Sequence, residues 1–247
     1  MPMKPERTVY FYGTCLIDLF YPRVGLAAVE ILQREGVSVI YPPDQSCCGQ
    51  PAWNSGFREQ AQEVIRAQLR LFKKPYPIVV PSASCAGMIK NHWPQACDAS
   101  SREKSQVQDI AARVIEFTDY LLEHLHVQPQ CLKDPLKIAI HDSCSALREM
   151  HVAGNIERLL NSMGVEQLQQ ANKQECCGFG GTFAVKQADI SGAMVQDKAR
   201  ALLETGADLV LSQDCGCLMN IGGALEHQNQ TLPVLHVAEF LRKYGYE

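Results

Sequence analysis

The sequence predicts an α/β protein of two pseudo-repeated lobes, each built around a parallel sheet and related by an approximate twofold axis. The length of 247 residues suits one large domain or two small ones. Short apolar runs alternate with amphipathic stretches in both halves, a pattern typical of strand-helix units with parallel strands. The spacing of three cysteines and a glycine also occurs twice, 129 residues apart: Cys15, Cys47, Cys48 and Gly49, then Cys144, Cys176, Cys177 and Gly178.

The first half predicts five elements in chain order. They are a strand, two helices, a second strand and a final helix: residues 9–12, 25–34, 57–72, 78–80 and 114–121. The first strand ends in small and polar residues just before Cys15, and the second strand is followed in the same way by Cys85. Each of these two cysteines is therefore expected just after the end of a strand.

The second half predicts the same elements in the same order: residues 138–140, 156–163, 190–203, 209–212 and 234–241. Cys144 follows its first strand, and Cys215 and Cys217 follow its second strand. The polar, proline-marked segment 127–135 is the best candidate linker. We therefore place a boundary at about residue 130, which gives lobes of residues 1–130 and 131–247 that pack face to face.

Composition and charge exclude several classes of protein. Lys and Arg number 23 against 27 Asp and Glu, a net charge of -4, and no basic run is present, which argues against a nucleic-acid partner. Nowhere do 18 apolar residues follow one another, and the polar amino terminus does not resemble a signal peptide, so we expect a cytoplasmic protein without a membrane span. The 11 cysteines of such a protein indicate metal binding or redox chemistry rather than disulfides.

The repeated cysteines can supply four thiolates in each half. They come from three loops, and in a parallel sheet those loops lie at one edge. Four thiolates repel one another unless a metal centre neutralises them, and both zinc and iron-sulfur clusters accept four thiolates. The adjacent cysteine pair favours a cluster, because neighbouring side chains in an extended backbone point apart and a cluster offers several iron corners. Gly49 and Gly178 allow an unusual φ and bring backbone close to the sulfurs.

The doubled cysteine pattern resembles that of the cysteine-rich CCG-domain proteins, which include one of the heterodisulfide reductase subunits and the iron-sulfur subunit of glycolate oxidase. Residues 46–56 (SCCGQPAWNSG), 176–183 (CCGFGGTF) and 217–221 (CLMNI) are most similar to the lactate utilization protein A family, and the resemblance spans nearly the whole chain. It implies two iron-sulfur clusters, expected to be [4Fe-4S], on two sets of ligands: Cys15, Cys47, Cys48 and Cys85, then Cys144, Cys176, Cys177 and Cys217.

The resemblance also implies a function. It indicates an oxidoreductase subunit that transfers electrons in an L-lactate-oxidising complex, receives lactate-derived electrons and works with lactate utilization proteins B and C. It identifies no catalytic side chain. Heterodisulfide reductase members have Cys-x-x-Cys where this chain has single cysteines at Cys85 and Cys217, so a cubane cluster is easier to build here than a larger assembly. Two alternatives stay open: a thiol-disulfide reductase subunit and a zinc-stabilised structural module.

Four further residues have weaker assignments. Cys215 lies two residues before Cys217 and could replace it as a ligand. Cys97 and Cys131 have no counterpart in the other half, and we interpret them as a buried or a surface thiol. His141 could donate a hydrogen bond to a cluster sulfur and tune its potential. The glycine run at 178–182 lacks the Lys-Ser/Thr ending of a phosphate loop, and we interpret it as backbone that lies against a cluster.

Overall fold

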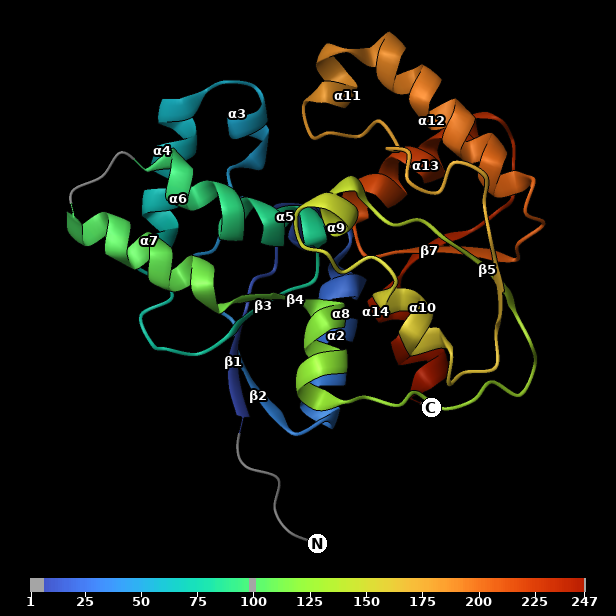
Figure 1. Cartoon of the computed structure of the whole chain (residues 1–247), viewed down its shortest axis with the longest axis horizontal. Coiled ribbons are helices and arrows are strands. Elements are labelled where there is room, and N and C mark those ends of the chain that lie inside the picture. Colours follow the sequence, from blue (N-terminus) through green and yellow to red (C-terminus); the bar gives the residue numbers. More distant parts are fainter. Residues whose placement is uncertain (1–6, 98–100, 247) are drawn as a thin grey trace, which may run out of the picture.

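Each half of the chain builds one four-stranded parallel sheet flanked by helices (Figure 1). The computed structural model describes residues 7–97 and 101–246. The strand orders, β2-β1-β3-β4 and β6-β5-β7-β8, are the same in the two sheets. This arrangement confirms the predicted α/β class with two similar lobes. The strands are β1 Arg7–Phe11, β2 Val37–Ile40, β3 Ile78–Val80, β4 Val114–Glu116, β5 Lys137–Ile140, β6 Glu166–Leu168, β7 Leu209–Ser212 and β8 Val234–His236.

The helices alternate with these strands. Those of the first lobe are α1 Cys15–Phe20, α2 Pro22–Arg34, α3 Gln50–Asn54, α4 Arg58–Leu69, α5 Ala83–Gly87, η1 Met88–His92, α6 Trp93–Ala96, α7 Ser101–Arg113, α8 Phe117–Asp119 and η2 Tyr120–Leu125. Those of the second lobe are α9 Cys144–Arg148, α10 Asn155–Leu160, α11 Phe183–Lys186, α12 Ala188–Leu203, α13 Cys215–His227, α14 Val237–Phe240 and η3 Leu241–Gly245. Within the described residues, no helix combines the length and the apolar character that crossing a bilayer requires.

The strand register shows which residues of the two lobes are equivalent. Ile78 of β3 pairs with Val114 of β4, and Val210 of β7 pairs with Val234 of β8. Counted from these pairs, Cys217 occupies the position of Cys85 in the other lobe. Cys215 falls on the position of Ala83, the first residue of α5.

The ends of the two halves differ from the sequence prediction. The sequence predicts helix throughout residues 114–121 and 234–241, but the first three residues of each segment are strands, β4 and β8. Both triplets pair in parallel with the preceding strand of their sheet, so backbone pairing at the sheet edge outweighs the helical periodicity of the longer segment. The helices begin only at Phe117 and Val237.

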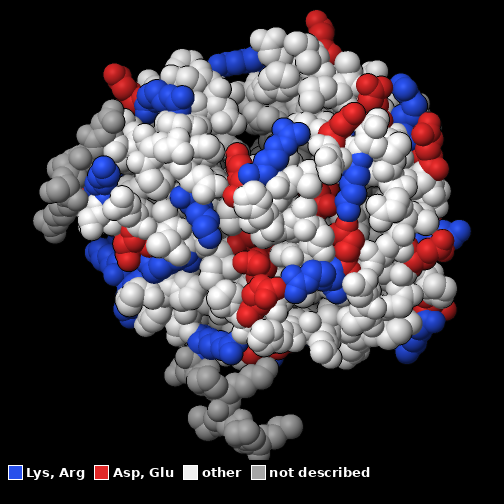
Figure 2. Space-filling view, in the orientation of Figure 1, with Lys and Arg blue, Asp and Glu red and all other residues white. Residues whose placement is uncertain are grey.

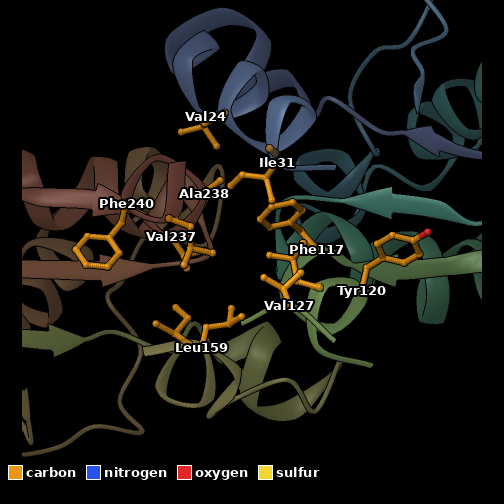
Figure 3. Packing of buried hydrophobic residues seen from close by; sticks show 14 of the residues in the cluster. Val24, Ile31, Phe117, Tyr120, Val127, Leu159, Val237, Ala238 and Phe240 are labelled. Atoms are coloured by element: carbon orange, nitrogen blue, oxygen red, sulfur yellow. The ribbon is translucent and has the colours of Figure 1, made fainter. Parts of the chain in front are cut away.

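One buried apolar cluster joins the two lobes (Figure 3). Val24 and Ile31 of α2 lie beside Ala238 of α14 in this cluster, and α2 packs against α14. Reciprocally, α10 of the second lobe packs against α8 of the first, and Leu159 and Phe117 belong to the same cluster. Each large apolar side chain buried in this way contributes roughly 1.5–3 kcal/mol. The two lobes therefore stabilise each other through a shared core.

Glu116 and His236 occupy equivalent positions at the ends of β4 and β8, and each caps the helix that follows. The Glu116 carboxylate accepts hydrogen bonds from the backbone N–H groups of Thr118 at 2.7 Å and Asp119 at 3.2 Å. The His236 Nδ1 atom accepts from the Ala238 N–H at 3.1 Å. Both caps are fully buried. Burial raises the pKa of Glu116 from 4.5 to about 8 and lowers the pKa of His236 from 6.5 to about 4.

The Glu116→Gln variant is expected to be less sensitive to pH than the parent protein. Between pH 4.5 and about 8 the folded protein keeps a proton on Glu116 that the unfolded chain releases, so the free energy of unfolding falls as the pH rises through this window. The neighbouring Asp214 charge acts in the same direction. Denaturant midpoints of both proteins at pH 5 and pH 8 measure the effect. Equal losses of stability in the two proteins would contradict it.

Candidate functional site

Three loops of the first lobe bring four cysteines to the carboxyl ends of the strands. Cys15 begins α1 after β1, and the Thr14 hydroxyl caps that helix by accepting from the Ile17 N–H at 3.4 Å. Cys47 and Cys48 lie in the loop that leads into α3. Cys85 lies in the first turn of α5, whose N-cap Ser82 accepts from the Cys85 N–H at 3.3 Å. The loops beyond parallel strands are where open α/β folds place their ligands.

The four sulfurs of this first set contact one another in a chain. Cys15 and Cys47 are hydrogen-bonded through their side chains, as are Cys47 and Cys48. The Sγ atoms of Cys48 and Cys85 are 3.4 Å apart. All four side chains line a cavity of about 220 Å³. Second-lobe residues close its other side, among them Phe179.

The second lobe repeats the same chain of contacts. Cys144 at the start of α9 is hydrogen-bonded to Cys176, Cys176 to Cys177, and Cys177 to Cys217 in the first turn of α13. The structure thus brings together all four predicted cysteines of each half. At the last position, Cys217 and not Cys215 contacts Cys177.

Each set readily holds one thiolate. A hydrogen bond from Cys15 lowers the pKa of Cys47 to about 3, and one from Cys144 lowers the pKa of Cys176 to about 2. The same hydrogen bonds raise the pKa values of the donors Cys15 and Cys144. Further deprotonation would place like charges side by side in a poorly solvated site. A cationic centre removes that penalty, so each set suits a metal that takes thiolate ligands.

Backbone groups support the cysteine pairs. Gly49 and Gly178 have φ values of 87° and 84°, and their N–H groups donate to the sulfurs of Cys47 at 3.4 Å and Cys176 at 3.3 Å. An added Cβ at Gly178 would lie 2.8 Å from the Ser191 carbonyl oxygen, so only glycine fits there. The glycines therefore have the role expected from the sequence, since they bring the backbone against the sulfurs.

Side-chain amide and indole groups hold the second cysteine of each pair. The Trp93 Nε1 atom donates to the Cys48 carbonyl oxygen at 2.8 Å, and the Asn220 Nδ2 atom donates to the Cys177 carbonyl oxygen at 2.8 Å. Trp93 is completely buried. Sequence reasoning missed both residues, because they are not at equivalent positions and neither belongs to a motif of its own.

His141 lies at the second set, as the sequence suggested. Its ring nitrogen lies within 4.8 Å of the Cys177 and Cys217 sulfurs. The side chain is fully buried, and among the described residues neither ring nitrogen has a hydrogen-bond partner. Burial and the nearby Lys198 charge lower its pKa to about 3, so the imidazole is neutral. The equivalent position of the first lobe holds Tyr12, which donates to the Ser46 carbonyl oxygen at 3.0 Å.

The two sites differ in one buried charge. Gly49 lies against Ala61 of α4 and Gly178 against Ser191 of α12, which aligns Gln68 with Lys198. Gln68 is a neutral amide that donates to the Ser46 hydroxyl at 2.7 Å. The Lys198 Nζ atom instead donates to the Asn172 carbonyl oxygen at 2.7 Å and to Gln170 Oε1 at 3.3 Å. Its charge interacts with Cys176, Cys177 and Cys217.

A buried carboxylate links the lobes beside both sites. Asp214, the N-cap residue of α13, accepts from the Ser82 hydroxyl at 2.6 Å and from the Ser84 hydroxyl at 2.7 Å. It also accepts from the Ser84 N–H at 3.1 Å. Asp214 is 1 % exposed and the two serines belong to the other lobe. No local sequence signal indicates a contact between such distant residues.

The remaining cysteines lie elsewhere. Cys97 is buried at the end of α6, and Cys131 is exposed. Neither lines the cavity of the first set. Cys215 does line it, together with the four first-lobe cysteines, although it belongs to the second lobe. Sequence reasoning considered Cys215 as a substitute for Cys217 or as a spare thiol, because it could not tell which way successive residues of α13 point.

The face of the molecule shown in Figure 2 carries both acidic and basic side chains. Acidic and basic side chains are interspersed there, and the basic ones do not form a continuous patch. At the top of Figure 1, α3 of the first lobe faces α11 of the second, and Pro51 of α3 and Val185 of α11 line the cavity of the first set. The Ser55 and Thr182 hydroxyl oxygens are 2.5 Å apart at this contact.

The donor sets fit an iron-sulfur cluster. Each offers four sulfurs from three loops, and in each a glycine with positive φ directs its backbone N–H group at a cysteine sulfur. Thiolate sulfur is the ligand that such clusters and zinc prefer.

Comparison with known proteins agrees with this geometry. The cysteine-rich domain family named CCG matches residues 9–90 and 138–222, one copy in each lobe. Lactate utilization protein A of Geobacillus sp. (strain WCH70) is 39% identical over 234 residues, which cover 94% of this chain and 98% of that protein. The protein of the same name from Shouchella clausii is 40% identical with the same coverage.

Among solved structures, a hypothetical protein from Helicobacter pylori has a similar fold, with a TM-score of 0.68 and 11% sequence identity. The match covers 99% of this chain, which spans about half of that protein. The sequence-based resemblance is thus confirmed over almost the full length. The chain belongs to the lactate utilization protein A family and contains two copies of the cysteine-rich domain.

Proposed function

We propose that the protein is an iron-sulfur electron-transfer subunit that acts in L-lactate oxidation. The observation that carries the proposal is the pair of equivalent four-cysteine sets, one in each lobe. In this proposal each set binds one [4Fe-4S] cluster, with ligands Cys15, Cys47, Cys48 and Cys85 in the first lobe and Cys144, Cys176, Cys177 and Cys217 in the second. The family name supplies the link to lactate. The partners are lactate utilization proteins B and C, and the complex is cytoplasmic.

A cluster in such a site supplies one-electron chemistry. The chain's own residues hold it and set its surroundings. The Gly49 and Gly178 N–H groups donate to sulfur, which stabilises negative charge on the sulfurs. Burial of Cys48 and Cys177 excludes water from one side of each site. Trp93 and Asn220 hold the cysteine pairs in place through their backbone.

The dimensions of the first site favour a relay over a lactate-binding site. Its cavity of about 220 Å³ is lined by thiols, apolar groups, four hydroxyl side chains and one amide. This volume is below the roughly 300–1,000 Å³ of common small-molecule sites. A cluster would fill much of this space, which leaves little room for a hydroxy acid and a hydride acceptor. In this proposal lactate is therefore oxidised on a partner subunit, whose electrons this chain receives.

Metal and acid-labile sulfide content of anaerobically purified protein tests the proposal. We expect about eight iron and about eight sulfide per chain, as two four-iron clusters require, and a broad visible absorption band that bleaches with dithionite. Zinc without sulfide would overturn the proposal and leave a zinc-stabilised structural module, because zinc carries no electrons.

A further inference from the structure

The first site contains one thiol, that of Cys215, in addition to the four cysteines of the sequence repeat. Cys215 is 3 % exposed and lines the same cavity as the four cysteines of the first lobe. Its charge interacts with that of Cys85 across the lobe boundary. Cys215 begins α13, and α13 packs against α1, the helix that carries Cys15. A buried thiol thus faces the first site from the opposite lobe.

The geometry of α13 explains why Cys215 and Cys217 serve different sites. Residues two apart on a helix are separated by about 200° around its axis, so their side chains point to nearly opposite sides. Cys217 points to Cys177 in its own lobe, whereas Cys215 lines the first-lobe cavity. Between them, a Cβ on Gly216 would lie 2.4 Å from the Phe179 ring. The glycine lets this ring pack against the first turn of α13, where the ring also lines the first-site cavity.

The equivalent position of the other lobe has no such role. Ala83 begins α5 as Cys215 begins α13, and it packs across the lobe boundary against Ala146 and Val152. That small apolar cluster contains no sulfur ligand. The extra thiol is therefore specific to the first site. At the equivalent position of the first lobe, Ala83 is sufficient for packing, so packing alone does not require a cysteine.

We propose that Cys215 is a fifth thiolate ligand of the metal centre in the first site, so that this centre is bound by residues of both lobes. The inference rests on the proposed function, since it requires a metal centre in the first cysteine set. On binding, the Cys215 thiol loses its proton to solvent, and its sulfur bonds to an iron that one of the four first-lobe cysteines also binds, so that this iron has two thiolate ligands. The fifth thiolate adds one negative charge and makes the first site chemically different from the second. The bond to iron also links the first turn of α13 to the first lobe. It lies next to the hydrogen bonds that Asp214 accepts from the Ser82 and Ser84 hydroxyls.

The test compares Cys215→Ser with the parent protein in a background that carries only the first site. Cys177→Ser removes a predicted ligand of the second site, so the remaining iron and the EPR signal of the reduced protein report the first. Adding Cys215→Ser to this background is expected to change the EPR g values. It should also speed iron loss to a chelator on the order of tenfold, the scale seen when a metal site loses a supporting group.

Two controls make the result specific. Cys97→Ser also replaces a buried first-lobe cysteine but lies outside the cavity, so it should leave the EPR spectrum and the chelation rate unchanged. In a Cys48→Ser background, where the second site alone carries iron, Cys215→Ser should have no effect. If the double variants fail to fold, the single Cys215→Ser and Cys97→Ser variants are compared for iron, sulfide and EPR signal.

The outcomes separate the two proposals. A parent protein that contains zinc and no sulfide overturns the proposed function and this inference with it. A parent protein with about eight iron whose first-site signal is the same with and without Cys215 retains the proposed function and overturns the fifth ligand. A change of equal size in both backgrounds also overturns it, because a ligand of the first site would not alter the second.

Discussion

Serine in place of Cys48 is expected to halve the iron content, from about eight to about four atoms per chain, because the first cluster loses a ligand. Cys48 is completely buried, and its Sγ atom lies 3.4 Å from Cys85, in the middle of the chain of thiol contacts. Cys215 lines the same cavity but belongs to the first turn of α13 in the other lobe, whereas Cys48 lies in the loop before α3. Iron and sulfide assays on anaerobically purified protein measure the loss.

Cys177→Ser is the matched change in the second lobe, and it should remove the other half of the iron. The exposed Cys131 provides the control, and Cys131→Ser should keep the full iron content. Full iron retention in either Cys48→Ser or Cys177→Ser would show that the two sets do not each bind a cluster.

Alanine in place of Gly178 is expected to lower the free energy of unfolding by roughly 2–4 kcal/mol and to release the iron of the second site. Gly178 has φ = 84°, and a Cβ there would lie 2.8 Å from the Ser191 carbonyl oxygen. Both atoms belong to backbone, so α12 or the cysteine loop has to move. That movement disturbs the Gly178 N–H group, which donates to Cys176. Denaturant unfolding and iron content together measure the effect.

Gly49→Ala provides a graded comparison. Gly49 has φ = 87°, but the nearest atom to its Cβ position is the Ala61 carbonyl oxygen at 3.6 Å, an ordinary contact. This variant should lose only the roughly 1–2 kcal/mol that a left-handed conformation costs alanine. If the two alanine variants were equally stable, the close approach at Gly178 would have no energetic weight.

The repeat made much of the architecture predictable. Spacing alone placed Cys15 and Cys144 after the first strands and the cysteine pairs in loops, because strand ends and glycine turns leave a local signature. The ends of the halves were less predictable, since the short segments that begin at Val114 and Val234 suit a strand or a helix and only pairing decides.

Contacts between distant segments could not be predicted from one sequence. Trp93 reaches the Cys48 carbonyl group from a position that is Leu225 of α13 in the second lobe, so the repeat gives no sign of this contact. Asp214 and Cys215 cross from one lobe to the other, and their direction depends on how α13 sits against the first lobe. These contacts depend on the packing of one lobe on the other, which no local sequence pattern encodes.

Gln68 in the first lobe and Lys198 in the second occupy equivalent positions but differ in charge, so the two cysteine sets have different electrostatic surroundings. An ammonium group held 2 % exposed beside the second set stabilises added negative charge there, and the neutral amide beside the first set does not. In the proposed two-cluster protein this charge would make the midpoint potentials differ, with the second cluster the stronger electron acceptor. An electron that enters through the first lobe would move downhill to the second. The difference between Gln68 and Lys198 would thus favour electron transfer from the first lobe to the second.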